Sequence, residues 1–395
     1  MSFPSSVPVP EEVLEIVRVL ERAGHEAWCV GGVLRDILLG VPNWDVTDLA
    51  TSARPHEVQR LFRRTAPIGV EHGTVGVIDR HHVMHEVTTF RRDVRTDGRH
   101  AVVEFGASID EDLARRDFTI NAIAYHPLRR EWRDPHQGER DLEARVIRAV
   151  GDPAARFRED YLRVLRAIRF AARFDFAIDP ATWKAAREAA GGLGRLSAER
   201  VRDEWFKGGR TARDLRTLVR LWHESGAAAV WLPELRPADA GVPPPELSPP
   251  PRDPVLLTAL LASDPVGLLR RLRSSNAEIA RAEAMVEGPH EPEGTDAVSV
   301  RRWLAAVGVA GDDLLALHRL RHVSDAPWLG LVRAIRERGD PLTRGDLALG
   351  GRDLEAIGIR GRAVGETLAA LLDRVLQDPA ANTRERLLEL ARERR

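Results

Sequence analysis

Residues 25–55 read HEAWCVGGVLRDILLGVPNWDVTDLATSARP, and this stretch decides the fold of the N-terminal part. The apolar run before Gly31 and Gly32 predicts a short strand, and residues 33–39 predict a helix. Two glycines at a strand-to-helix turn let the backbone approach a ligand, and the following helix offers free N–H groups to an anion. A tight turn without a ligand would use the same glycines, so the turn alone leaves both interpretations open.

The acidic residues that follow raise a question of spacing. Asp45 and Asp48 are three residues apart, whereas side chains of a strand share a face at positions i and i+2. With Glu86 of HEVTTF on a neighbouring strand, they could form a carboxylate cluster of the kind that Mg²⁺ prefers. A phosphate-binding turn followed by paired aspartates is typical of two-metal nucleotidyl transfer. A solvated loop with an Asx-turn is the alternative.

Hydrophobic periodicity divides the chain into a part with mixed helices and strands and a part that is almost entirely helical. Residues 9–23 have helical periodicity, and alternation at 73–79, 81–90 and 101–106 predicts strands, so residues 25–105 should form a small mixed sheet with helices. After residue 108 nearly every segment is helical by period, including 110–127 and 158–174. The proline density of residues 236–254 predicts a surface loop between helical units.

The composition is that of a globular chain of two to four structural units. Of 395 residues, 43% are hydrophobic and 30% are charged, and the net charge of −1 argues neither for nor against nucleic acid. Only Lys184 and Lys207 are lysines, so 57 of the 59 basic residues are Arg. A GC-rich genome would produce this bias, and Arg also suits phosphate and base contacts.

The number of cysteines and the N-terminal sequence indicate the cellular compartment that we expect. Cys29 is the only cysteine, so an internal disulfide and a multi-cysteine zinc site are excluded. We expect a reducing, cytoplasmic setting, no signal peptide at the N-terminus and no membrane span, since no stretch approaches about 20 apolar residues.

Two charged pairs could bind a nucleotide. Arg116 and Asp117 in RRDFTINA stand at a predicted helix start, where the arginine could reach a triphosphate. Asp160 and Arg163 in REDYLRVLRAIRF are spaced i, i+3 on one predicted helix face, and could imitate a complementary base edge by accepting from and donating to a base. Ordinary salt bridges are the alternative for both pairs.

The histidines give no convincing site by spacing. His81, His82 and His85 lie in a predicted strand, where helical zinc spacing does not apply. His318 and His322 are four residues apart, but no following acidic residue fits a phosphohydrolase of the HD type, and a polar helix face is expected there.

Taken in order, several segments resemble the bacterial class II tRNA nucleotidyltransferases, that is, the CCA-adding enzymes and the similar poly(A) polymerases. The segments that carry the resemblance cover residues 28–210 almost without interruption: VGGVLRDILLG, DLATSARPHEV, GVEHGTVGV, HEVTTFR, DEDLARRDFTINAIAY, DPHQGERDL and RAVGDPAARFREDYLRVLRAIRFAARFDF. The C-terminal DPAANTRERLL resembles the family more loosely.

The resemblance implies an α/β nucleotidyltransferase head with a small mixed sheet, followed by an all-α neck, body and tail. The expected bounds are 1–145, 146–210, 211–330 and 331–395. It implies template-independent addition of CMP, CMP and AMP from CTP and ATP to the 3′ end of tRNA, with Mg²⁺ as cofactor and no stable protein partner. Poly(A) polymerase, a CC-only or A-only enzyme, and an inactive RNA-binding paralogue are the alternatives.

The resemblance also assigns residues to roles. The catalytic carboxylates are Asp45, Asp48 and Glu86, of which Asp45 and Asp48 bind the metal. The nucleotide-binding residues are Gly31, Gly32, Arg35, Asp36, Arg116, Asp117, Asn121, Asp160, Arg163 and Arg166. The loop containing RTDGRHAVVEF has His100 and Ala101 where the family carries Arg-Pro, and its presence favours CCA or A addition over CC addition.

The acidic strand departs from the family pattern of Asp-x-Asp followed by a hydrophobic residue, Ala and Thr. One inserted residue near Thr47 would align both Asp45 and Asp48 with this pattern. We therefore expect a β-bulge at Val46–Thr47 that turns the two carboxylates to one face. The rival pair is Asn43 with Asp45, which is correctly spaced but carries one charge fewer.

Overall fold

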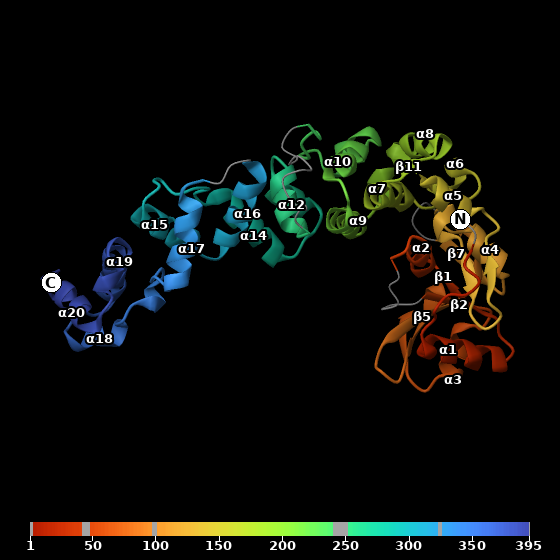
Figure 1. The fold of residues 1–395 in the computed structure, drawn as a ribbon, viewed down its shortest axis with the longest axis horizontal. Helices are drawn as coiled ribbons and strands as arrows, with labels where there is room; N and C mark the ends of the chain where they lie inside the picture. Colours follow the sequence, from red (N-terminus) through yellow and green to blue (C-terminus); the bar gives the residue numbers. More distant parts are fainter. Residues whose placement is uncertain (1–2, 42–47, 97–100, 240–251, 323–325, 395) are drawn as a thin grey trace. The chain divides into compact units, whose positions relative to one another are not determined.

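The computed structural model describes residues 3–41, 48–96, 101–239, 252–322 and 326–394. Two compact units share the chain: Met1–Ala240 with Arg271–Arg273, and Gly241–Arg270 with Ser274–Arg395. The first contains the sheet and the second is helical, coloured from red to green and from teal to blue in Figure 1. None of the described helices is long and apolar enough to cross a membrane.

The first unit is built on a mixed sheet of seven strands in the order β3-β4-β5-β2-β1-β8-β9. β2 and β5 run parallel, and the other neighbouring strands run antiparallel. The strands are β1 (Ala27–Val30), β2 (Asp48–Thr51), β3 (Thr65–Gly69), β4 (Thr74–Ile78), β5 (Met84–Thr89), β8 (Ala124–His126) and β9 (Glu131–Arg133).

Both faces of β1 are buried, which explains its uninterrupted apolar sequence AWCV. Ala27 and Cys29 enter a core with residues of α1 (Glu11–Arg22), α2 (Gly32–Leu38) and α3 (Pro55–Leu61). The alternate residues, Trp28 and Val30, enter a second core with Ile109 and Leu113 of α4 (Ile109–Ala114). The sheet therefore separates two hydrophobic cores.

Helices make up the remainder of the first unit, besides two small strand pairs. α7 packs against α9 and α10, and Trp205 of α9 meets Trp222 of α10 edge to face at 5.6 Å. The helices are α5 (Gly138–Ala144), α6 (Pro153–Glu159), α7 (Leu162–Phe174), α8 (Pro180–Glu188), α9 (Ala198–Thr211), α10 (Leu215–Glu224) and α11 (Ala227–Trp231). The strand pairs are β6 (Arg91–Thr96) with β7 (Ala101–Phe105), and β10 (Val146–Ile147) with β11 (Ala177–Ile178).

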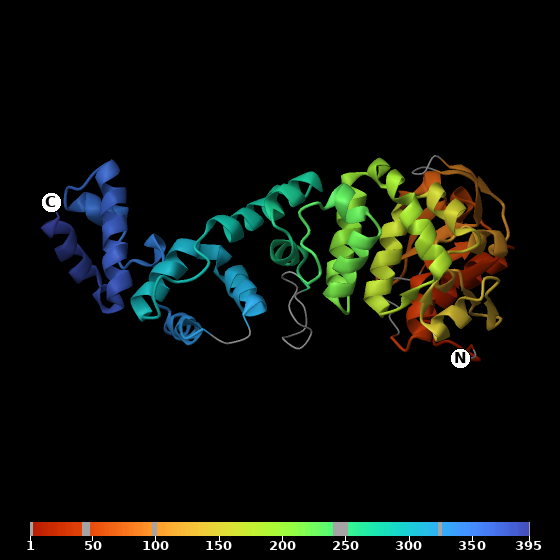
Figure 2. The same ribbon diagram turned by 90° about the horizontal axis from the view of Figure 1, so that it is seen from above.

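Two of the hydrophobic cores among the described residues lie in the second unit, whose helices are seen again in Figure 2. Trp303 and Trp328 lie in one core, and Leu354, Leu371 and Leu387 lie in the other. The helices are α12 (Pro254–Leu261), α13 (Pro265–Arg271), α14 (Asn276–Glu287), α15 (Ala297–Val307), α16 (Gly311–Arg321), α17 (Trp328–Arg338), α18 (Gly351–Ala356), α19 (Arg362–Gln377) and α20 (Arg384–Glu393).

The predicted fold class, a mixed sheet followed by helices, is confirmed, but two predicted helices are interrupted. Within 110–127 the helix ends at Ala114, and a 3₁₀ turn (Thr119–Asn121) and β8 follow. The reason is pairing with a distant segment: Thr119 N–H donates to the Arg148 carbonyl, and Val150 N–H donates to that of Asp117. Such pairing overrides local periodicity.

The second interruption lies within 158–174, where Asp160 stands between α6 and α7. Its backbone is extended (φ −152°, ψ 107°), so Asp160 and Arg163 do not share a helix face as the spacing predicts. Instead, Asp160 Oδ1 accepts from the N–H of Leu162, the first residue of α7, at 3.0 Å.

Candidate active site

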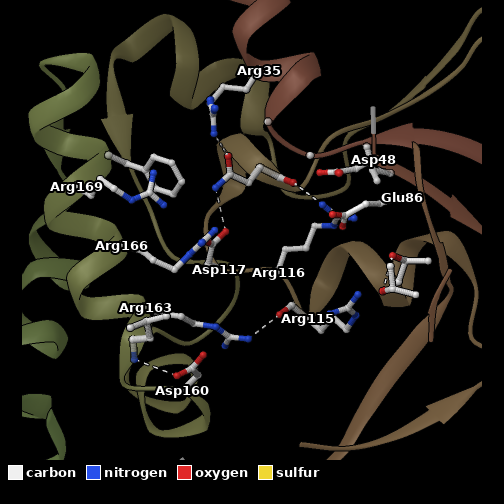
Figure 3. A pocket seen from close by; sticks show the side chains of 18 of the residues that line it. Arg35, Asp48, Glu86, Arg115, Arg116, Asp117, Asp160, Arg163, Arg166 and Arg169 are labelled. Atoms are coloured by element: carbon white, nitrogen blue, oxygen red, sulfur yellow. Dashed lines mark hydrogen bonds and ion pairs between the residues drawn. The ribbon is translucent and has the colours of Figure 1, made fainter. Parts of the chain in front are cut away.

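A cavity of about 620 Å³ opens in the first unit between β2 and β5 of the sheet and helices α7 and α9 (Figure 3). Its lining is rich in arginine, and the positive charges outnumber the carboxylates, so the cavity suits a polyanionic ligand. The arginines are Arg35, Arg91, Arg115, Arg116, Arg163, Arg166, Arg169, Arg173 and Arg200, and the carboxylates are Asp48, Glu86, Asp117, Glu159 and Asp160.

The glycine turn borders this cavity directly. Gly31 has φ +83°, and a Cβ atom placed on it would lie 3.0 Å from Asp48 Oδ2 and 3.7 Å from Arg116 Nη1. A Cβ on Gly32 would lie 3.1 Å from Arg35 Nη2. The two glycines thus keep the backbone close to charged groups of the cavity, and their predicted approach to a ligand stays a prediction.

Asp48 and Glu86 are brought together by the parallel pairing of β2 and β5. They are direct partners in the register, and the alternate residues Leu49 and Val87 enter the first core, so both carboxylates face the other side. Removal from water and the negative charge of Glu86 raise the pKa of Asp48, while Arg116 opposes the shift. Two facing carboxylates, together with the raised pKa of Asp48, fit a divalent cation.

The predicted partner of Asp48 cannot be placed, because Asn43, Asp45 and the predicted bulge at Val46–Thr47 lie outside the described residues. The Cα register of β1 with β2 is regular from Asp48 to Thr51.

Arg115 and Arg116 are anchored by one buried carboxylate, Asp112 at the end of α4. Its Oδ1 pairs with Arg115 at 2.8 Å and its Oδ2 with Arg116 at 3.2 Å. Burial alone would raise the pKa of Asp112, but the two guanidinium charges outweigh it and lower the pKa. Arg116 also donates to the Asn121 carbonyl at 3.3 Å, which directs its guanidinium toward Asp48 and Glu86 (Figure 3).

Asp117, Asn121, Arg35 and Arg166 form one connected network across the cavity. Asp117 accepts from Arg166 Nε at 2.7 Å and from the Asn121 amide at 3.0 Å, and Arg35 donates to Asn121 Oδ1 at 2.6 Å. Burial would raise the pKa of Asp117, but Arg166 and the hydrogen bonds lower it to about 2. The carboxylate is therefore ionised and holds Arg166 in place.

Arg35 and Asp36 link α2 to α7. Asp36 Oδ1 accepts from Arg35 at 2.8 and 2.9 Å, and its Oδ2 accepts from Arg173 at 2.9 Å. The guanidinium of Arg35 also lies 4.7 Å from the ring centre of Phe174 and 5.1 Å from that of Phe170. Its burial lowers the pKa of Arg35.

The predicted base-reading residues, Asp160 and Arg163, line the cavity without pairing with each other through their side chains. Arg163 pairs with Glu159 at 2.6 Å and donates to the Arg115 carbonyl at 3.0 Å. Asp160 Oδ2 pairs instead with Arg200 of α9 at 2.7 Å. Both side chains are thus held by groups from three separate segments.

Several site residues were missed from the sequence. Arg115, Arg169, Arg173 and Arg200 line the cavity, and the buried Glu204 pairs with Arg169 at 2.6 Å and lies 4.0 Å from Arg166. A signal existed: Arg163, Arg166, Arg169 and Arg173 recur every three or four residues along α7, which places them on one face. The histidines near residue 81 do not gather, since His85 pairs with Asp79 and His81 with Glu12.

Comparison with known proteins identifies the family. Residues 27–148 match the model of the poly A polymerase head domain, and residues 175–239 match that of a probable RNA- and SrmB-binding site of polymerase A. A CCA-adding enzyme of Anoxybacillus flavithermus is 45% identical over 198 residues, which is 50% of this chain and 49% of that protein. Over these matches the chain spans about half the length of the first curated relatives.

Other matches run over the whole chain. A CCA-adding enzyme of Latilactobacillus sakei is 35% identical over 99% of this chain and 100% of that protein. The crystal structure of the Bacillus stearothermophilus CCA-adding enzyme in complex with CTP is 33% identical, with a TM-score of 0.81 and 98% of both chains covered. The chain therefore belongs to the class II family of CCA-adding enzymes.

Proposed function

We propose that this protein adds CMP, CMP and AMP, from CTP and ATP, to the 3′ end of tRNA without a nucleic-acid template. The observation that carries the proposal is a single cavity with two facing carboxylates, Asp48 and Glu86, at one side and two base-edge groups, Asp160 and Arg163, at the other. Nucleotidyltransferases of the polymerase type use divalent metal ions, and the facing carboxylates fit such an ion.

The metal is proposed to be Mg²⁺, held by Asp48 together with Asp45, with Glu86 beside them. When bound, it would supply charge neutralisation at the triphosphate and activation of the attacking 3′-hydroxyl. Arg116, which Asp112 and the Asn121 carbonyl orient, is positioned to bind the triphosphate. The Gly31–Gly32 turn leaves room for the phosphates beside Asp48.

Selection of C and A is proposed to occur at Asp160 and Arg163. Cytosine and adenine each carry an exocyclic amino group, from which a carboxylate can accept a hydrogen bond. A guanidinium can donate to a ring nitrogen or a carbonyl oxygen of the base. U and G present a different pattern of donors and acceptors and would not match both of these partly buried groups, which costs binding energy. Arg166, fixed by Asp117 and lying beside this pair, completes the edge.

The remaining assignments follow the family. We propose residues 1–145 as the catalytic head, 146–210 as the neck that reads the base, and 211–330 and 331–395 as the body and tail that bind tRNA. The structure of a Thermotoga maritima CCA-adding enzyme complexed with tRNA_CCA has the same fold, with a TM-score of 0.67. The buried, unpaired Cys29 is compatible with action in the cytoplasm.

Defined tRNA substrates test the proposal. The protein is incubated with Mg²⁺, CTP and ATP, and with tRNA that lacks its terminal CCA, CA or A, and the products are sized by nucleotide. Addition of three, two and one nucleotides supports CCA addition. Long A tails would indicate a poly(A) polymerase, arrest at one type of nucleotide would indicate a CC-only or A-only enzyme, and binding without incorporation would indicate an inactive paralogue.

A further inference from the structure

A cluster of nitrogen and oxygen donors lies in the second unit, outside the nucleotide cavity. We propose that Glu291, His318 and His322 form a binding site for Zn²⁺. One donor atom from each residue lies within 4.8 Å of the other two. The sequence predicts only a polar helix face at these histidines, and this prediction is wrong for His318, whose side chain is 8% exposed.

The two histidines are neighbours because of helical spacing. His318 lies in α16 and His322 follows its last residue, so the two rings lie one turn apart with their centres separated by 4.4 Å. Two imidazoles at i, i+4 present nitrogen donors on the same side of a helix, the arrangement that many zinc sites use.

Glu291 supplies the third donor from the segment between α14 and α15. Its Oε1 lies 2.9 Å from His318 Nδ1 and 3.7 Å from His322 Nε2. Donors about 2.0–2.2 Å from a tetrahedral Zn²⁺ ion lie roughly 3.4 Å from one another, and the two observed distances bracket this value. Small side-chain rotations would therefore convert the ion pairs into a coordination shell.

One side of the cluster packs against other side chains, and the other side is exposed to solvent. His318 packs against Trp328 with a ring-centre distance of 4.8 Å, whereas Glu291 and His322 are 47% and 52% exposed. The Trp303 indole N–H donates to the Pro289 carbonyl at 2.7 Å and so fixes the chain two residues before Glu291. Three protein donors beside solvent leave a fourth position for water.

The donor set selects the ion. Two imidazoles and one carboxylate suit Zn²⁺ and similar transition ions, whereas Mg²⁺ prefers oxygen donors throughout, as at Asp48 and Glu86. Because the ion would join the segment after α14 to the end of α16, it would stabilise the second unit. Without an ion, the same residues form only a partly exposed hydrogen bond and a weak ion pair.

Binding is tested on the full chain, stripped with a chelator and kept in excess Mg²⁺ so that oxygen sites are occupied. Zn²⁺ is titrated against a chromophoric competitor, and Co²⁺ is added separately to record its visible absorption. We expect one Zn²⁺ per chain, an intense Co²⁺ band typical of four-coordination, and an increase in unfolding temperature with Zn²⁺. Glu291→Gln and His322→Gln should each lower the affinity about tenfold or more.

His290→Gln and Glu293→Gln are the matched controls, since these exposed residues flank Glu291 but lie outside the cluster. Both control variants should bind Zn²⁺ like the unmodified chain. The four variants change exposed residues only, so each should fold, and far-ultraviolet circular dichroism checks this. Absence of stoichiometric binding, or binding that survives both Glu291→Gln and His322→Gln, would overturn the proposal.

Discussion

Arg200 reaches from α9 to Asp160, and its Nη2 lies 2.7 Å from Asp160 Oδ2. The other oxygen of Asp160 accepts from the Leu162 N–H, so the carboxylate is held at both ends. Arg200 and Glu204 are four residues apart on α9, and Glu204 holds Arg169 in the same way. The helix α9 therefore orients Asp160, one of the residues proposed to read the base. Residues 198–210 of α9 fall within the predicted neck, but Arg200 and Glu204 themselves were not predicted as site residues.

The first prediction concerns Arg200→Ala. Asp160 would lose its orienting partner, so the KM for CTP should rise about tenfold, a change of about 1.4 kcal/mol, with increased incorporation of UMP. The side chains of Arg200 and Asp160 are about one-third exposed. Because solvent screens their charges, we expect a loss of binding energy at the lower end of the range for charge-assisted hydrogen bonds. Single-nucleotide incorporation kinetics with each of the four nucleotides measure both effects.

Arg202→Ala serves as the control, because Arg202 lies on the same helix and pairs with Asp203 instead of the cavity residues. It should leave KM and fidelity unchanged. If Arg200→Ala also leaves both unchanged, Asp160 does not depend on Arg200 for its orientation.

The second prediction separates backbone strain from crowding at the glycine turn. Gly31 and Gly24 have nearly the same dihedral angle, φ +83° and +86°, but a Cβ on Gly24 would meet nothing within 4 Å. Both Ala substitutions should therefore cost stability through the backbone, on the order of 1–2 kcal/mol at Gly24 and more at Gly31, whose ψ of −149° lies in a region that essentially only glycine adopts. Only Gly31→Ala should also displace the Asp48 carboxylate and lower kcat.

Urea unfolding and incorporation rates measured on both variants test this difference. A loss of stability in both variants with a loss of rate only in Gly31→Ala would support the role of the turn. A rate that falls equally in both variants would show that activity follows stability alone.

The third prediction uses the lowered pKa of Asp117, which lies at about 2 against 3.8 for a free aspartate. Because the folded state binds the proton more weakly than the unfolded state, ionised Asp117 stabilises the fold above about pH 4. This contribution, on the order of 2 kcal/mol, is lost as the pH falls from 4 to 2. Asp117→Asn should therefore be less stable at pH 7 and differ little at pH 2.

Unfolding by urea at several pH values measures the effect. Asp110→Asn is the control, since Asp110 is about half exposed and pairs only loosely with Arg133 at 3.7 Å. It should change stability by a few tenths of a kcal/mol at every pH. A pH-independent difference for Asp117→Asn would mean that lost packing, and not ionisation, explains its instability.

The sequence predicts the sheet and its glycine turn well because both depend on local patterns. The apolar run AWCV and the alternation in HEVTTF specify strands, and the position of Glu86 in its strand assigns it to the acidic edge. The pairing partner of Glu86 has no local signal in the sequence, because the parallel register of β2 with β5 joins segments separated by almost forty residues.

The mispredicted parts depend on distant contacts. Residues after Ala114 follow a helical period, yet they pair with the segment around Ala149 instead. Asp160 has helical spacing to Arg163, but its side chain accepts from the Leu162 N–H and binds Arg200, forty residues away in the sequence. Glu204 carries no local signal, because its role depends on the packing of α9 against α7.

The last prediction identifies the metal-binding carboxylates. Asp48 faces Glu86, and its raised pKa reflects an unfavourable concentration of negative charge that a divalent cation would relieve. Asp48→Asn should reduce incorporation on the order of 10³-fold, since metal stabilisation of the transition state is worth several kcal/mol. It should also weaken the dependence of the unfolding temperature on Mg²⁺.

Asp45→Asn and Asn43→Ala then distinguish the two possible partners. If a bulge at Val46–Thr47 aligns Asp45 with Asp48, Asp45→Asn should be as inactive as Asp48→Asn, and Asn43→Ala should retain most activity. If Asn43 and Asp45 form the site instead, Asn43→Ala should lose activity and Asp48→Asn should keep it. Incorporation of CMP into tRNA that lacks CCA, measured at a range of Mg²⁺ concentrations, separates the two cases, because a weakened metal site shifts the concentration required for activity.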